Sequence, residues 1–168
     1  MKFKTPIEID FLDFFKTGRF DCLKLGQSKE WILNNFPNPD SSFDLESQKN
    51  GFDIWTYDDV ELHFENDILF LIYSDHWYEW KLEGGENLNL EKWIFDDISR
   101  LTLNYVLESL NSHNIDYKKK IDNLGVLLRL NSGIELTFEN IEDIDSLDSN
   151  SFHITSFGLV AENPNRWK

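Results

Sequence analysis

The spacing of apolar residues changes along the chain, from a helical period before Phe52 to an alternating period after it. Thr5 and Pro6 suit the cap and the first position of a helix. Behind them, four apolar residues follow the i, i+4, i+7, i+8 spacing of one helix face: Ile7, Phe11, Phe14 and Phe15. The pattern therefore predicts an amphipathic N-terminal helix that ends at Gly18.

A second helix is predicted between Ser28, which suits a helix cap, and Phe36, which precedes Pro37. Residues 38–51 are rich in turn-forming residues and predict a loop. From Phe52 on, apolar and polar residues alternate, and short turn sequences interrupt the alternation. This pattern predicts three strands, at residues 52–57, 60–66 and 68–74.

The middle strand, VELHFEN, alternates most regularly. Its apolar side chains should share one face: Val60, Leu62 and Phe64. Its polar side chains should share the other: Glu61, His63 and Glu65. One buried and one solvated face are typical of an antiparallel sheet. The next stretch, HWYEWKL at residues 76–82, either extends this sheet or forms an aromatic rim.

The second half of the chain writes a similar pattern. A long helix is predicted over residues 97–112, and strands are predicted over residues 125–131, 134–140 and 152–160. The second of these strands, IELTFEN, begins at Ile134 and nearly repeats VELHFEN, which begins at Val60.

One shift of 74 positions, from Val60 to Ile134, aligns more than this pair of strands. It also places the second helix on the long helix and, without a gap, Trp55 on Arg129. We therefore predict one α+β domain over residues 1–168, built of two pseudo-repeats at about residues 1–88 and 89–168. Each would be a helix followed by a three-stranded antiparallel meander. The two would form one sheet or two packed sheets, with helices on one face; chance similarity of two meanders is the alternative.

The first repeat resembles the repeated unit of the β-lactamase inhibitor protein and of the outer-membrane lipoprotein BamE. The resemblance lies in LKLGQSKEWILNNFPNPD (residues 23–40) and DIWTYDDVELHFENDILFLIY (residues 53–73), where Trp55 holds an early aromatic position. The second repeat departs from it, with Arg100 in place of Gly26 and Arg129 in place of Trp55. The resemblance implies a helix-and-meander scaffold and no catalytic residues.

The chain as a whole is similar in type to bacterial immunity proteins, which neutralise secreted or contact-delivered toxins. Its net charge is −15 at pH 7, from 31 acidic and 16 basic residues. Such a charge repels nucleic acids and anionic lipids and attracts basic proteins, although it also simply keeps a protein in solution. We expect neither a nucleic acid nor a membrane as partner.

The N-terminal segment places Glu8, Asp10 and Asp13 among its apolar residues, which no secretory signal does. Cys22 is the single cysteine, so no internal disulfide forms, in keeping with a reducing compartment. We expect a cytoplasmic protein, whose oligomeric state the sequence leaves open.

The sequence contains no recognisable catalytic or metal-binding motif, and we expect neither enzymatic activity nor a cofactor. The histidines and the single cysteine lack the spacing of a zinc site. Cys22 lies between apolar neighbours and is expected to be an inert thiol rather than a nucleophile. Glu61 and Glu65 with His63 between them suit acid–base chemistry, but the outer face of any strand shows such alternation.

Aromatic residues beside carboxylates are the strongest functional signal. Large rings supply binding energy at protein interfaces, and charge steers the encounter. We therefore predict a partner-binding surface made of Trp55, Tyr57, Glu61, His63, Glu65, Asp75, Trp77, Tyr78 and Trp80. The alternative is that these rings pack in the core.

The leading hypothesis is an immunity protein that binds a basic toxin domain, such as a nuclease. The alternatives are a small enzyme, with a site around His63, Glu61 and Glu65 or at Cys22, and a non-catalytic assembly scaffold.

Overall fold

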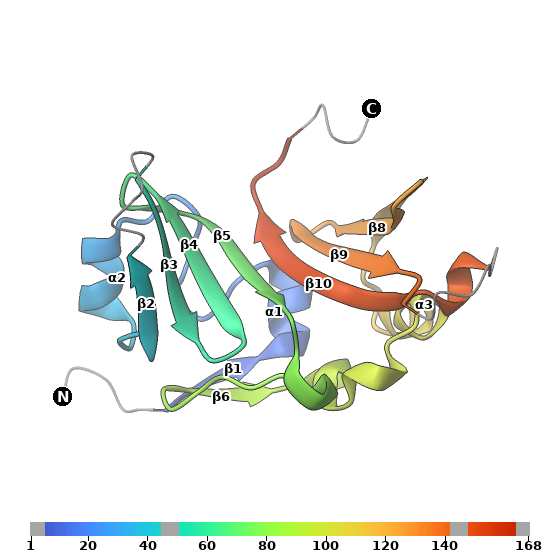
Figure 1. The fold of residues 1–168 in the computed structure, drawn as a ribbon, viewed down its shortest axis with the longest axis horizontal. Coiled ribbons are helices and arrows are strands. Elements are labelled where there is room, and N and C mark those ends of the chain that lie inside the picture. Colours follow the sequence, from blue (N-terminus) through green and yellow to red (C-terminus); the bar gives the residue numbers. More distant parts are fainter. Residues whose placement is uncertain (1–5, 45–50, 142–147, 164–168) are drawn as a thin grey trace.

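The computed structural model describes residues 6–44, 51–141 and 148–163. Within them the chain forms an eight-stranded antiparallel sheet, a two-stranded parallel sheet and three α-helices, which confirms the predicted α+β class (Figure 1). The described residues contain no helix that is both long and apolar enough to span a bilayer.

The large sheet has the strand order β2-β3-β4-β5-β10-β9-β8-β7. Four strands come from the first half of the chain: β2 (Ser41–Asp44), β3 (Phe52–Tyr57), β4 (Val60–Glu65) and β5 (Ile68–Asp75). Four come from the second: β7 (Tyr117–Asp122), β8 (Gly125–Leu130), β9 (Ile134–Glu139) and β10 (His153–Val160). The sequence pattern predicted six of these and missed β2 and β7.

The two halves join where β5 and β10 pair antiparallel, so they share one sheet rather than forming two (Figure 1). Tyr73 of β5 lies opposite Gly158 of β10 in this seam. The centre of the molecule is therefore a strand pair to which each half contributes one member.

The three α-helices are α1 (Phe11–Thr17), α2 (Lys29–Asn35) and α3 (Leu103–Ser112). The side chains of Ser28 and Thr102 cap α2 and α3, each accepting a hydrogen bond from the backbone N–H three residues on. The predicted long helix from residue 97 is therefore shorter, because Thr102 starts a new helix after a separate 3₁₀ turn at Ile98–Arg100.

The same backbone contacts recur in both halves. Ser28 bridges Ile68 at the start of β5, and Thr102 bridges His153 at the start of β10. The hydrogen bond from Leu69 N–H to the Gln27 carbonyl (2.9 Å) has a counterpart from Ile154 N–H to the Leu101 carbonyl (3.0 Å). The last strand of each half also carries one extra residue that breaks the register, Phe70 in β5 and Thr155 in β10, and the two lie at equivalent places.

The register of β8 corrects the ungapped alignment of the two halves. Two residues join β3 to β4, whereas residues 131–133 join β8 to β9, with Gly133 at a φ of 96°. The strand before the longer loop is thus displaced by one position. Trp55 corresponds to Leu128 and Thr56 to Arg129, and a one-residue shift moves a side chain to the opposite face of the sheet.

The N-terminal helix begins later than predicted. Ile7–Asp10 forms β1, which pairs in parallel with β6 (Leu88–Glu91), and Asp10 then caps α1. Gly18 ends this helix as predicted, with a φ of 73°, while Thr5 lies outside the described residues. The helical spacing misled here because pairing with a distant strand fixed the backbone of residues 7–10.

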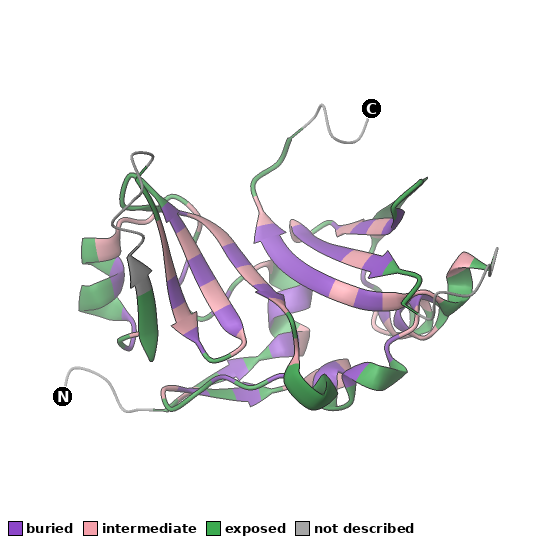
Figure 2. Cartoon of the chain, viewed as in Figure 1, coloured by how far each residue is buried: buried purple, intermediate pink, exposed green. Residues whose placement is uncertain are grey.

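The core lies between the helices and one face of the sheet. It is rich in phenylalanine, and the rings of α1 meet those of β10 and of the segment after β6: Phe11, Phe14, Phe15, Phe20, Phe36, Phe95 and Phe157 are all buried. Figure 2 shows buried residues alternating with partly exposed ones along the strands. The opposite face of the sheet is therefore the one on which a binding site is to be sought.

Candidate functional site

Trp55 and Tyr57 pack in the core, which is the alternative that the sequence left open, and do not belong to an exposed binding surface. Trp55 is 7% exposed and Tyr57 is fully buried. Both lie opposite the apolar positions of β4, Leu62 and Val60, so they share the core face. Phe52, which lies on the other face of β3 and has no polar group, is 39% exposed and faces outward. Alternation reveals two faces but does not say which one is buried.

Glu61, His63 and Glu65 point outward as predicted, on the face opposite Leu62 and Phe64. The Nε2 atom of His63 lies 2.5 Å from the Oε2 atom of Glu61. The His63 ring also meets the ring of Tyr73 edge-on, at 5.8 Å between centroids. These contacts link the outer face of β4 to the central strand β5.

Tyr73 stands at the seam because Gly158 leaves room for it. A Cβ atom on Gly158 would lie 3.1 Å from the Cδ2 atom of Tyr73. Burial raises the pKa of the Tyr73 phenol; a hydrogen bond with Ser156 opposes the shift, and the charge of Asp75 adds to it. The phenol is therefore a neutral hydrogen-bonding group at physiological pH.

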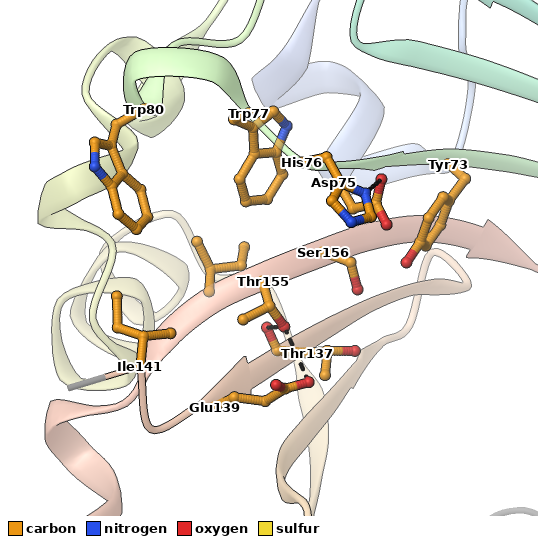
Figure 3. A pocket seen from close by; sticks show the side chains of 11 residues that line it. Tyr73, Asp75, His76, Trp77, Trp80, Thr137, Glu139, Ile141, Thr155 and Ser156 are labelled. Carbon is orange, nitrogen blue, oxygen red and sulfur yellow. Dashed lines mark hydrogen bonds and ion pairs between the residues drawn. The ribbon is translucent and has the colours of Figure 1, made fainter. Parts of the chain in front are cut away.

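Beside Tyr73 the outer face is hollowed into a groove of about 570 Å³, which we call the seam groove (Figure 3). It crosses the strands that join the two halves. Its lining comes from β5 and the turn after it, from β9 and the segment just after it, and from β10: Tyr73, Asp75, His76, Trp77, Trp80, Thr137, Glu139, Ile141, Ile154, Thr155 and Ser156.

Two tryptophans form one wall of the groove. Trp77 is anchored, since its Nε1–H donates to the Ser74 hydroxyl (2.8 Å) and its ring stacks on Phe157 at 6.1 Å. Trp80 is freer, with 43% of its surface exposed, and Figure 3 shows its ring directed toward the groove. Tyr78, between them, is 80% exposed and does not line the groove.

The turn that carries these rings is strained. His76, Glu79 and Trp80 have φ values of 52°, 49° and 58°, a backbone region that residues other than glycine rarely adopt. Such strain persists only where surrounding contacts hold it, and it concentrates at functional sites. Here the packing of Trp77 on the core supplies one such contact.

A carboxylate stands on either side of the groove floor. Asp75 on β5 is paired with His76, with 2.6 Å between Oδ1 and Nδ1, and this hydrogen bond and charge raise the pKa of His76. Glu139 on β9 is exposed and meets the Thr155 hydroxyl at 3.5 Å (Figure 3). Between the two strands, β10 supplies the hydroxyls of Thr155 and Ser156.

The structure therefore divides the predicted surface. Asp75, Trp77 and Trp80 come together in the seam groove, and Glu61 lies instead in a second, more open hollow with Asp58 and Glu83. The residues that the sequence reading missed come mainly from the second half: Thr137, Glu139, Thr155 and Ser156. The repeated strand sequence did contain one indication of Glu139, because Glu139 in IELTFEN occupies the position of Glu65 in VELHFEN.

The catalytic alternatives fare differently. Burial, followed by a hydrogen bond with Asp21 and its charge, raises the pKa of the Cys22 thiol to about 11, so the reactive thiolate is scarce at neutral pH. Across the described residues, no group of three or more His, Cys, Asp or Glu side chains is placed to hold a metal ion. His63 keeps its contact with Glu61 but lines neither of the two hollows described above.

A partner-binding role for these residues stays a prediction that rests on their geometry and chemistry. Comparisons with protein-family models, with curated proteins and with solved structures gave no match.

Proposed function

We propose that this chain is an immunity-type inhibitor, a cytoplasmic protein that binds a basic toxin domain and covers its active site or substrate surface. The observation that carries the proposal is the outer face of the large sheet. That face runs without interruption across both halves, and it is hollowed at the seam between aromatic rings and carboxylates. A chain with a net charge of −15, whose sheet face carries aromatic rings beside carboxylates at the seam, suits a basic protein partner.

The energy of such a complex would come mainly from the rings. Neutralising a lethal toxin calls for nanomolar affinity, which corresponds to about −12 kcal/mol. Exposed Tyr78 and Trp80 are available to a partner without unfolding the chain, and buried interface aromatics contribute about 2–4 kcal/mol each when they are truncated. Trp77 is a poorer test residue, because it also packs on the core.

The net charge of −15 would act chiefly on the rate of association. Opposite charges steer two proteins together over distances that salt shortens to about 10 Å at 0.1 M. Raising the salt concentration should therefore slow association more than it speeds dissociation.

The test has two stages. The tagged chain is first used to capture basic proteins from a lysate of its own host at low salt. Each captured protein is then produced in a sensitive host with and without this chain. The proposal expects one captured protein to arrest growth when produced alone and to be harmless when this chain is present.

Variants connect that result to the surface. Replacing Tyr78 and Trp80 together by alanine should abolish protection, while Trp31→Ala should preserve it, because Trp31 is a similarly exposed indole on helix α2. If no captured protein is toxic, the proposed function is wrong. If protection survives the double replacement, the proposed binding surface is wrong.

An enzyme is the second candidate, and one observation favours it. Glu61 lies close enough to His63 to orient the imidazole as a general base. An enzyme that destroys the toxin or its product would lose protection on His63→Ala while still binding the toxin. An inhibitor would keep both.

A further inference from the structure

We propose that the seam groove receives an arginine side chain of the partner, with its guanidinium against the Trp80 indole and paired with the Glu139 carboxylate. This inference rests on the proposed function, because it names the group by which a basic protein would be recognised. The groove, its rings and its carboxylates are the observations that carry it.

The chemistry of the lining selects a cation. The faces of indole rings attract positive charge, and Trp77 and Trp80 form one wall. Asp75 and Glu139 add negative charge from two different strands. The described lining includes no lysine or arginine, and its one basic residue, His76, is engaged with Asp75.

The shape of the site favours arginine over lysine. A planar guanidinium stacks flat on an indole and offers several N–H donors at once. The groove supplies acceptors for them, because the hydroxyls of Thr137, Thr155 and Ser156 line it and Figure 3 shows Thr155 beside the Glu139 carboxylate. A lysine ammonium is more strongly hydrated and would lose more on entering the same space.

Glu139 is the better placed of the two carboxylates. Asp75 already has a short contact with His76 (2.6 Å), whereas the contact of Glu139 with Thr155 is at the limit of a hydrogen bond (3.5 Å). Trp80 is the better placed ring, because Trp77 is held by Ser74 and Phe157. Both Glu139 and Trp80 can meet a ligand without breaking a contact of the core.

The experiment uses the whole chain and a small probe, N-acetyl-arginine methylamide, at millimolar concentrations. Binding is followed by the NMR signals of the indole N–H groups, of which the chain has six. The signals of Trp80 and Trp77 should shift and saturate. The lysine analogue should bind more weakly, and the uncharged norleucine analogue should cause no saturable shift.

Matched variants locate the charge. Glu139→Gln keeps the shape of the side chain and should weaken probe binding at least about tenfold, as expected for the loss of a charge-assisted hydrogen bond. Glu65→Gln removes the same charge from the equivalent position of the first half and should leave binding unchanged. Trp80→Leu should remove the saturable shift of the remaining indole in the groove, while Trp31→Leu should not.

Three results would overturn the assignment: no saturable shift at Trp80, equal or tighter binding of the lysine analogue, or equal loss of binding in the Glu65 and Glu139 variants. Because the probe is not a toxin, these results leave the growth-protection test untouched. Conversely, a chain that binds the probe but protects against no captured protein would keep the arginine site and lose the proposed function.

Discussion

Lys29 and Asp53 form an ion pair on the core side of the first half that the second half lacks. The ammonium of Lys29 contacts Asp53 and lies 3.1 Å from Asp67, while the second carboxylate oxygen of Asp53 is buried and has no hydrogen-bond partner in the described part of the chain. The equivalent positions in the second half are Leu103 and Val126, both buried and apolar. The second half therefore indicates that two apolar residues could replace Lys29 and Asp53 at these positions of the first half.

Copying the second half into the first should separate the two residues. Lys29→Leu alone leaves a carboxylate without its partner and should cost about 2–3 kcal/mol of unfolding free energy, less than a fully buried pair because the site meets some water. Adding Asp53→Val should recover most of that loss, or more than all of it.

Urea denaturation of the wild type, both single variants and the double variant measures this coupling. If the double variant loses as much unfolding free energy as the two single variants lose together, the two residues are not coupled and the apolar pair of the second half is no substitute for them.

The contact of His76 with Asp75 should make the stability of the fold depend on pH. The hydrogen bond with Asp75 is the largest cause of the raised pKa of His76, and the negative charge of Asp75 is the next largest. A raised folded-state pKa means that the contact stabilises the fold fully below the ordinary histidine value of about 6.5, and that this contribution fades as pH rises through the folded-state value.

The wild type should accordingly exceed His76→Asn in melting temperature at acidic pH, and the two should converge at alkaline pH. An NMR titration should place the midpoint of His76 above the ordinary value. A midpoint at or below it would contradict the contact with Asp75.

At the scale of elements, the two helix caps form a natural pair. Ser28 and Thr102 each cap a seven- or ten-residue helix and each bridges the first residue of a seam strand. Ser28→Ala and Thr102→Ala should each lower the free energy of unfolding by about 1 kcal/mol. Chemical denaturation measures both, and serine-to-threonine exchange at residue 28 is the control that keeps the cap.

Elements fixed by local signals were predictable, and elements fixed by distant partners were not. Helix α2 and strands β4 and β9 lie within a residue or so of their predicted bounds, because caps and tight turns mark them. Strand β1 was missed because its partner, β6, is far along the chain. Strands β2 and β7 were missed because turn formers and a run of lysines hid them.

The candidate site was predictable only in part for the same reason. Asp75, Trp77 and Trp80 are neighbours in sequence and were grouped by their chemistry. Glu139 and Ser156 reach them only through the pairing of β5 with β10, which no local pattern announces. Trp55 was assigned to the binding surface although it lies on the core face, because the alternation along β3 does not say which of its two faces is buried.

At the scale of the whole molecule, the two halves share one core as well as one sheet. Phe11 and Phe15 of α1 contact Phe157 of β10, at 5.6 Å between ring centroids in both cases. Helix α1 belongs to the first half and β10 to the second, so neither half buries its apolar surface alone.

Unfolding should therefore be a single transition. Far-UV circular dichroism and tryptophan fluorescence should give the same midpoint in urea, with one melting endotherm in calorimetry. Two separated transitions would show that the halves fold independently and that the seam is a contact between domains.

The pairing of Tyr73 with Gly158 has a further consequence. These two residues occupy equivalent places in the two halves, so an approximate two-fold axis passes between them. A perfectly symmetric sheet would carry two grooves. In the second place, however, Phe70 and His63 stand where Thr155 and Thr137 stand in the first, and their rings meet at 6.2 Å. Across the described residues the doubled backbone thus offers one such seam groove, and a partner that uses it should bind in one orientation, with a stoichiometry of one to one.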